Sequence, residues 1–295
     1  MPSMPPVCQG PRDTVNKPKF AVPAGACDCH SHILGPVTRF PYAADRSYTP
    51  PDASAENFTA MLGALGFERG IVVQASAYGS DNSRVVAAID ELGQHRARGV
   101  VMVGHAVQEE ELRRLHAAGM RATRFITTAR GGPSIEQLPK VAEKVAALGW
   151  HIEMYVPPAD WEWLLPIVSR LPVPVVFDHM AGLPAGTGEN DPRLRAILGL
   201  LEEGRAWVKL CGYRNSLTGF PYDDVAGLAR IFVARAPDRC VWGSDWPHTT
   251  ITGRMPDDGE LLDLLADWVP DPAVREKILV SNPARLYGFE QEESA

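Results

Sequence analysis

The chain has 295 residues, of which 45% are hydrophobic and 22% charged, a composition typical of a globular protein with a large apolar core. Its formal net charge of −7 argues against a nucleic-acid partner bound through a broad basic surface, although local arginines can still bind small anions. No stretch approaches the roughly 20 apolar residues of a membrane-spanning helix, and the Pro-rich start lacks the apolar segment of a secretory signal. We therefore expect a cytoplasmic protein with no membrane partner.

Five cysteines are scattered along the chain, at Cys8, Cys27, Cys29, Cys211 and Cys240. An odd number over this length does not resemble a disulfide framework, so reduced thiols are expected. Cys27 and Cys29 lie beside a histidine pair, which leaves a zinc knuckle as an alternative, but no Cys-x-x-Cys motif follows them.

Residues 1–20 are polar and interrupted by prolines, without periodicity, and are predicted to form an N-terminal arm on the surface or at an interface. Residues 21–295 are expected to form a single domain, because no Gly/Ser-rich linker and no shorter repeat divides them. Within this domain, short β-branched or apolar runs alternate with helical patterns. Eight runs are predicted strands: Ala26–His30, Gly70–Gln74, Gly99–Val103, Ala122–Ile126, His151–Val156, Pro174–Asp178, Ala206–Leu210 and Cys240–Ser244.

The stretches between these strands carry apolar residues at helical spacing. Strands that alternate with helices form parallel sheets, and eight of them are enough to close a barrel. The sequence therefore predicts an α/β protein whose catalytic domain is a (β/α)8 TIM barrel. The predicted helices include Asp81–His95, Gln108–Ala118, Ile135–Leu148, Pro192–Glu203 and Val225–Ala236.

Polar residues follow several predicted strands at their carboxyl ends, where the active sites of such barrels lie. The first strand leads into His30 and His32, and two residues spaced by two on an extended chain project to the same side. The sixth strand leads into His179 and the eighth into Asp245. A single histidine is more often structural than catalytic, so the prediction depends on the convergence of all four groups.

The His-x-His at the first strand, the Asp178-His179 pair and the segment Trp242–His248 resemble the amidohydrolase superfamily (amidohydrolase-related family 2). More narrowly, several segments are similar to its 2-pyrone-4,6-dicarboxylate lactonase family. The resemblance spans nearly the whole chain. It implies an amidohydrolase-like barrel and a carboxylic-ester hydrolase that opens a small anionic lactone, with 2-pyrone-4,6-dicarboxylate from aromatic-compound degradation as the expected substrate. The segments are Asp28–His32 with Gly35-Pro36, Val73–Ser76, Gly119–Arg121 and Ser281–Tyr287.

The resemblance leaves the cofactor open. Two-metal members of the superfamily place a bridging Lys on strand four and a His ligand on strand five, where this chain has Arg124 and Tyr155, so a binuclear site is not expected. Either no cofactor is required, and the histidines act as hydrogen-bond donors and cations that polarise the lactone carbonyl, or one divalent metal ion is bound. Zinc suits the ligand set, which would be His30, His32, His179 and Asp245.

Asp245 is the candidate general base, because a carboxylate at the rim can take a proton from the attacking water. The alternative is an Asp that only orients His248 or caps the following helix. The resemblance implies that Arg124, Arg130 and Arg214 bind substrate carboxylates, for which the fork-shaped guanidinium is suited.

A loop arginine such as Arg130 is more often a surface charge, whereas Arg124, within a strand, would be buried and so needs an anionic partner. Tyr48, Ser76 and Tyr155 match family positions that donate hydrogen bonds to the substrate. His248 is a further candidate substrate-binding residue.

Several other functions fit the same residues. A sulfomuconolactone hydrolase is a rival, because Arg binds sulfonate as well as carboxylate. A sugar-lactone hydrolase or isomerase, a metal-dependent decarboxylase and a non-catalytic anion-binding protein are further alternatives, which metal content and product identity would separate. The loop Thr127–Pro133 is expected to shape the choice of lactone, and the sequence leaves a homo-oligomer open.

Overall fold

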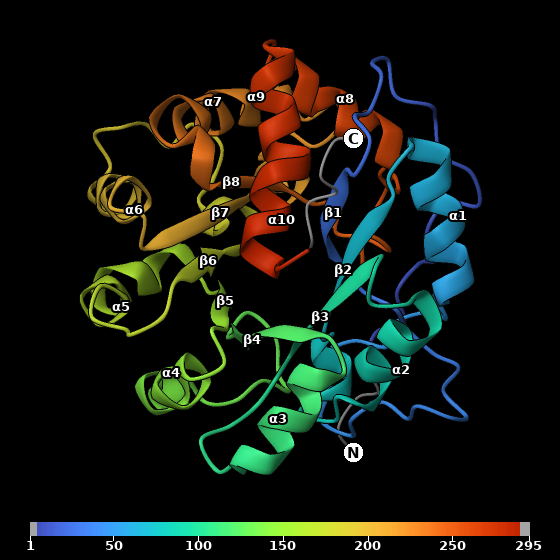
Figure 1. Ribbon diagram of the computed structural model, residues 1–295. Coiled ribbons are helices and arrows are strands. Elements are labelled where there is room, and N and C mark those ends of the chain that lie inside the picture. Colours follow the sequence, from blue (N-terminus) through green and yellow to red (C-terminus); the bar gives the residue numbers. More distant parts are fainter. Residues whose placement is uncertain (1–4, 290–295) are drawn as a thin grey trace, which may run out of the picture.

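The computed structural model describes residues 5–289, in which eight parallel strands pair with one another in sequence order (Figure 1). This confirms the predicted (β/α)8 barrel. The strand over Ala206–Leu210 has the predicted bounds, and the other predicted strands differ from the observed ones by one or two residues at one or both ends. The strands are β1 (Cys27–Ser31), β2 (Arg69–Val73), β3 (Ala97–Val101), β4 (Met120–Ile126), β5 (His151–Tyr155), β6 (Val175–Phe177), β7 (Ala206–Leu210) and β8 (Cys240–Trp242).

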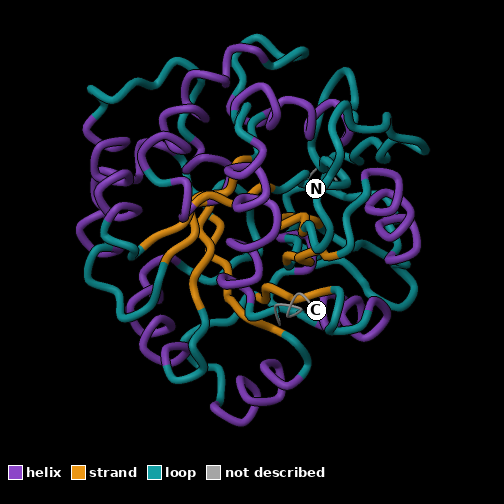
Figure 2. Tube along the Cα trace, turned by 45° about the horizontal axis from the view of Figure 1, so that its top comes forward, coloured by secondary structure: helices purple, strands orange, loops and turns teal. Residues whose placement is uncertain are grey.

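Helices surround the strands on all sides (Figure 2). The five predicted helices are present with shorter ends, and the fourth strand is followed by a 3-10 turn (Ile135–Gln137) before its helix begins. Side-chain caps set several boundaries: Asp191 accepts hydrogen bonds from the first turn of α6. The helices are α1 (Ala55–Leu65), α2 (Ser83–Leu92), α3 (Glu109–Ala117), α4 (Leu138–Ala146), α5 (Trp161–Val168), α6 (Pro192–Glu202), α7 (Ala226–Arg235), α8 (Asp258–Trp268), α9 (Pro272–Glu276) and α10 (Asn282–Tyr287).

The barrel closes between β1 and the segment that follows β8. The amide of Asp245 donates to the carbonyl of His30, and the amide of His32 donates to the carbonyl of Trp246, each at 2.8 Å. Gly243 permits this approach, because a Cβ at that position would lie 2.6 Å from the Cβ of His30. The backbone contacts that close the barrel therefore also place the first-strand histidines beside Asp245.

The opposite end of the barrel is covered by α10, which crosses in front of the strands in Figure 1. The ring of Tyr287 lies 5.1 Å from that of His151, the first residue of β5. Tyr287 and Phe289 pack in one apolar cluster with interior side chains of the strands, among them Val176 and Trp207. With this end filled, a ligand can enter the barrel only from the carboxyl ends of the strands.

The described part of the predicted arm, residues 5–20, lies against the barrel domain. Val7 forms a parallel bridge with Thr49, and the amide of Asn16 donates to the carboxylate of Asp257 at 3.0 Å. All five cysteines are free thiols, as predicted. None of the helices in residues 5–289 has the length and apolar character needed to span a membrane.

Candidate active site

A cavity of about 330 Å³ lies at the carboxyl ends of the strands. Its wall gathers residues from seven of the eight strand ends, together with the segments around residues 47–48 and 249–250. Eight of the predicted site residues line it: His32, Tyr48, Ser76, Arg124, Tyr155, His179, Arg214 and Asp245. Pro6, Ser47, Ile126, Thr128, Ala129, Thr249 and Thr250 complete the lining.

His30, His32, His179 and Asp245, here called the rim set, converge in the structure. His30 Nε2 and His32 Nε2 lie 3.6 and 3.5 Å from the same oxygen of Asp245, Oδ1. The His179 ring is 4.7 Å from the His30 ring. His30 does not itself line the cavity and stands directly behind Asp245, fully buried. The arrangement groups one carboxylate and three imidazoles, of which His32, His179 and Asp245 line the cavity.

The second oxygen of Asp245, Oδ2, is bound by Arg214 Nε and by the hydroxyl of Tyr213, the latter at 2.5 Å. Burial by itself would raise the pKa of Asp245, but the Arg214 guanidinium and the neighbouring histidines outweigh it and hold that pKa well below its usual range. Asp245 also adopts a left-handed backbone conformation (φ 65°), which costs about 1–3 kcal/mol for a non-glycine residue and is often found at functional sites.

Two histidines of the rim set are neutral at ordinary pH. Burial, reinforced by the nearby Lys209 and Arg124 cations, lowers the pKa of His30 well below its usual value. Burial likewise lowers the pKa of His179, more than the Asp245 carboxylate raises it. This corrects the expectation that these histidines act as cations: His30 and His179 are neutral imidazoles, which can polarise a carbonyl only by donating a hydrogen bond.

Beneath the rim set, the barrel interior holds Arg124, Glu153, Asp178 and Lys209, here called the interior ion cluster. Lys209 Nζ lies 2.6 Å from Glu153 Oε2 and 3.1 Å from Asp178 Oδ1. Arg124 Nε donates to Asp178 Oδ2 at 3.0 Å, and Tyr287 donates to Glu153 Oε1 at 2.8 Å. The buried Arg124 thus has the anionic partner it was predicted to need, but that partner is a protein carboxylate.

These contacts keep the interior groups charged despite their burial. Burial would raise the pKa of Glu153, but the Lys209 ammonium lowers it to about 2, and Lys209 together with Arg124 lowers that of Asp178. The two carboxylates in turn raise the pKa of Lys209 against the effect of burial.

Sequence reasoning did not identify Glu153, Lys209 and Tyr213. Glu153 and Lys209 each stand at an inward position of a predicted strand, so a charged residue amid an otherwise apolar run was the available signal. Tyr213 directly precedes Arg214, and nothing in its local sequence distinguishes it from a packed aromatic residue.

Two predicted substrate-binding residues do not line the cavity. Arg130 is exposed, and its backbone amide donates to Ser47 Oγ at 2.8 Å. His248 is buried, with Nε2 3.0 Å from Asp258 Oδ1 and its ring 5.3 Å from that of Tyr213. The His248 ring therefore packs against the ring of Tyr213. Arg130 carries its charge at the surface, as isolated loop arginines commonly do.

Ligand atoms of His30, His32 and Asp245 lie within 4.8 Å of one another, and imidazole with carboxylate is a donor set suited to zinc. One contact opposes a metal ion in the arrangement as it stands. Arg214 binds Oδ2 of Asp245 and leaves Oδ1 facing the histidines, but Lys209 Nζ lies 3.1 Å from His30 Nδ1, and an ammonium group can only donate to that nitrogen. The residues present therefore do not fit a metal ion without rearrangement.

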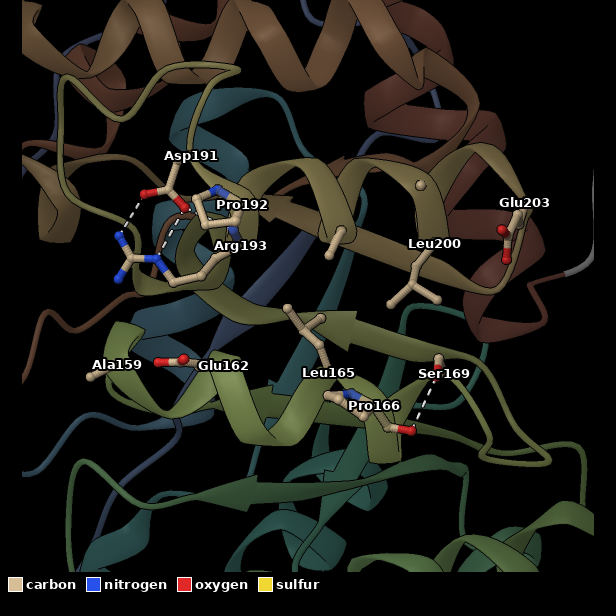
Figure 3. A pocket seen from close by; sticks show the side chains of 12 residues that line it. Ala159, Glu162, Leu165, Pro166, Ser169, Asp191, Pro192, Arg193, Leu200 and Glu203 are labelled. Atoms are coloured by element: carbon tan, nitrogen blue, oxygen red, sulfur yellow. Dashed lines mark hydrogen bonds and ion pairs between the residues drawn. The ribbon is translucent and has the colours of Figure 1, made fainter.

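A larger hollow of about 910 Å³ lies outside the barrel, between α5 and α6 (Figure 3). Leu165 and Leu200 form much of its apolar wall. Its charged residues include Asp191 and Arg193, which pair with each other at 2.6 Å instead of pointing at a common position. The smaller cavity at the strand ends is the candidate active site, because Asp245, His32 and His179 converge there at the carboxyl ends of the strands.

Residues 27–289 match the amidohydrolase family. The chain belongs to this family. A 4-sulfomuconolactone hydrolase from Rhizobium radiobacter is 39% identical over 289 residues, which cover 96% of each chain. A 2-pyrone-4,6-dicarboxylate hydrolase from Comamonas testosteroni is 38% identical over 288 residues, which cover 94% of each chain.

The fold also agrees with that of a solved structure. A crystal structure of an Agrobacterium tumefaciens protein without ligand has a TM-score of 0.86 and 32% sequence identity, and the match covers 93% of this chain and 100% of that one. The family assignment and the barrel therefore rest on both sequence and structure.

Proposed function

We propose that this protein hydrolyses a small lactone that carries two anionic groups, with 2-pyrone-4,6-dicarboxylate as the first candidate substrate. The observation that carries the proposal is the convergence of the Asp245 carboxylate, the imidazoles of His32 and His179 and two arginines on one cavity. The names of the two relatives support a lactone, since each is called a hydrolase of a small lactone bearing acidic groups.

The arginines supply recognition of the anionic groups. Arg124 uses only Nε on Asp178, and its two terminal nitrogens make no hydrogen bond within the described residues. That free edge has the fork geometry that binds a carboxylate through two parallel hydrogen bonds. Tyr48, Ser76 and Tyr155 line the same cavity and offer hydroxyl groups to the remaining polar atoms of the substrate.

The proposed reaction starts when Asp245 takes a proton from water and the resulting hydroxide bonds to the lactone carbonyl carbon. His179, whose ring lines the cavity, donates to the carbonyl oxygen as negative charge develops there, while His30 Nε2–H faces Asp245 Oδ1 at 3.6 Å and orients the base. The tetrahedral intermediate then breaks the bond between the carbonyl carbon and the ring oxygen. Asp245 returns its proton to that oxygen, which leaves as an enol, so that one water is added and the carboxylate base is restored.

Arg214 links binding to this chemistry. In the structure its Nε holds one oxygen of Asp245, which weakens that carboxylate as a base. A substrate carboxylate or sulfonate competes for the same guanidinium. When it draws Arg214 away, Asp245 becomes more basic at the time when a substrate is present to react.

A 4-sulfomuconolactone is the second candidate substrate, because the relative named for it is 39% identical over nearly the whole chain. The terminal nitrogens of Arg124 accommodate a sulfonate as well as a carboxylate. The values of kcat/KM for the two lactones are measured under identical conditions. The lactone with the higher value is the preferred substrate.

The test of the proposal is hydrolysis of 2-pyrone-4,6-dicarboxylate, followed by loss of its ultraviolet absorbance, with the product identified by mass. Enzyme treated with a chelator and untreated enzyme are compared. We expect equal rates and a product heavier by one water. A product of unchanged mass would indicate an isomerase, and loss of carbon dioxide a decarboxylase; turnover of neither lactone would contradict the proposal. A rate restored only by added zinc would contradict the metal-free mechanism but not the substrate.

A further inference from the structure

The two histidines of the first strand differ in the partner of their inner nitrogen, Nδ1. His32 Nδ1 lies 2.8 Å from the carbonyl oxygen of Val73, which can only accept a hydrogen bond. His32 therefore carries a hydrogen on Nδ1, and its Nε2 faces Asp245 Oδ1 at 3.5 Å. This is the pattern of a metal-ligating histidine, whose second nitrogen donates to a carbonyl or carboxylate.

His30 has the opposite arrangement. Its Nδ1 lies 3.1 Å from Nζ of Lys209, and an ammonium group can only donate. His30 Nδ1 is therefore the acceptor, and the hydrogen of the neutral ring is on Nε2. That Nε2 is buried, faces Asp245 Oδ1 at 3.6 Å and has no hydrogen-bond partner within residues 5–289.

The competing arrangement would have His30 Nδ1 donate to Asp178. Asp178 Oδ1 lies 3.4 Å from that nitrogen, farther than Lys209 Nζ at 3.1 Å, and is itself paired with Lys209 Nζ at 3.1 Å. Lys209 is held in place from the other side by Glu153 at 2.6 Å, and all these side chains are completely buried. A donor fixed by two carboxylates in a dry interior has little freedom to move away from His30.

We propose that Lys209 is a positioning residue that fixes His30 in the Nε2–H form. In this form His30 is a hydrogen-bond donor that orients Asp245 and not a metal ligand, because a nitrogen that carries a hydrogen has no lone pair for a metal ion. The role in the reaction rests on the proposed function. The position of the hydrogen on His30 and its effect on metal binding are independent of the proposed function.

The hydrogen position can be measured directly in the unaltered protein. Nitrogen-15 NMR of protein labelled at its histidine rings distinguishes Nε2–H from Nδ1–H, and the His30→Asn variant assigns the His30 signals. We expect the Nε2–H form for His30 and the Nδ1–H form for His32. The Nδ1–H form at His30 would overturn the proposal, and this result does not depend on any variant folding or on any substrate being turned over.

Zinc binding gives the second measurement. In Lys209→Met the inner nitrogen of His30 is released, and we expect the affinity for zinc, measured by competition with a fluorescent chelator, to rise by roughly 10–100-fold, the range seen for changes to groups that orient metal ligands. Lys209→Arg keeps a cationic donor and should retain the weak binding of the wild type. The exposed Lys140→Met is the matched control for loss of one positive charge.

Adding His30→Asn to Lys209→Met should abolish the gain in zinc affinity. Because Lys209→Met leaves Glu153 without its cation, the double variant Lys209→Met/Glu153→Gln removes that unpaired charge and provides a second test if the single variant is unstable. Equal zinc affinity in the wild type and in these Lys209→Met variants would overturn the proposal. The predicted hydrogen position together with inactivity toward every lactone would refute the proposed function and leave the role of Lys209 standing.

Discussion

The rim set and the interior ion cluster occupy adjoining layers of the same barrel, yet their polar atoms are used differently. In the interior, every charge has an opposite charge within 3.1 Å: Arg124 with Asp178, and Lys209 with Glu153. At the rim, His30 Nε2 and His179 Nδ1 have no hydrogen-bond partner among residues 5–289. Unsatisfied buried polar atoms are costly, so the rim set is suited to a ligand that supplies the missing hydrogen-bond partners. The interior ion cluster, whose charges are paired, is suited to holding the rim set in place.

The largest effect expected at the rim follows from Asp245→Asn. The amide keeps the shape of the side chain but cannot take a proton from water, so kcat should fall about 10³-fold, within the range for loss of a general base. Calorimetry should show that the substrate still binds. The exposed Asp90→Asn serves as the control, and a near-normal rate in Asp245→Asn would exclude this residue as the base.

The largest effect expected in the interior is on stability at acid pH. The folded-state pKa of Glu153 is about 2, against an ordinary value of 4.5, so ionised Glu153 stabilises the fold. That contribution, about 3 kcal/mol, is fully present above pH 4.5 and is lost as the pH falls toward 2. Urea unfolding between pH 7 and pH 2.5 should give a shallower acid slope for Glu153→Gln than for the wild type.

Asp28 provides an internal contrast in the same experiment. Burial raises its pKa to about 7, more than its hydrogen bonds from Ser244 lower it, so its contribution to stability is lost as the pH rises toward that value. This Asp28 contribution is the same in the wild type and in Glu153→Gln, so it cancels when the acid slopes of the two proteins are compared. Identical acid slopes for the two proteins would mean that Lys209 and Glu153 do not form the ion pair in solution.

The same two layers show how much could be predicted from the sequence. The alternation of strands and helices gave the barrel, and His30, His32, His179 and Asp245 stand in polar motifs at strand ends, where the barrel architecture itself assigns function. Glu153 and Lys209 lie within strands, and their partners come from other strands. Their pairing depends on register and on which side chains face inward, which local sequence does not specify.

Arg124 joins the two layers, because it binds Asp178 through Nε and lines the cavity with its terminal nitrogens. Arg124→Met should raise KM by roughly 10–100-fold, equivalent to the 1.5–3 kcal/mol of hydrogen bonds to a charged group. Arg124→Lys keeps the charge but loses the fork-shaped guanidinium, so its KM should lie between those of the wild type and Arg124→Met.

The exposed Arg113→Met, on α3, is the matched control for Arg124→Met. Steady-state kinetics separate the outcomes. A fall in kcat with unchanged KM would place Arg124 in the reaction step instead of substrate binding, and an effect on stability alone would assign it entirely to the interior ion cluster.

The smallest effect is expected at the far end of the interior, where Tyr287 of α10 donates to Glu153 Oε1 at 2.8 Å. Tyr287→Phe removes that hydrogen bond but leaves Lys209 on the other oxygen, so the free energy of unfolding should fall by about 1–2 kcal/mol while kcat and KM stay close to wild-type values. Unfolding in urea and steady-state kinetics on the same preparation measure both. If the rate fell and the stability did not, loss of the Tyr287 hydrogen bond would affect the rim set through Glu153 and Lys209. The two layers would then be a single catalytic unit.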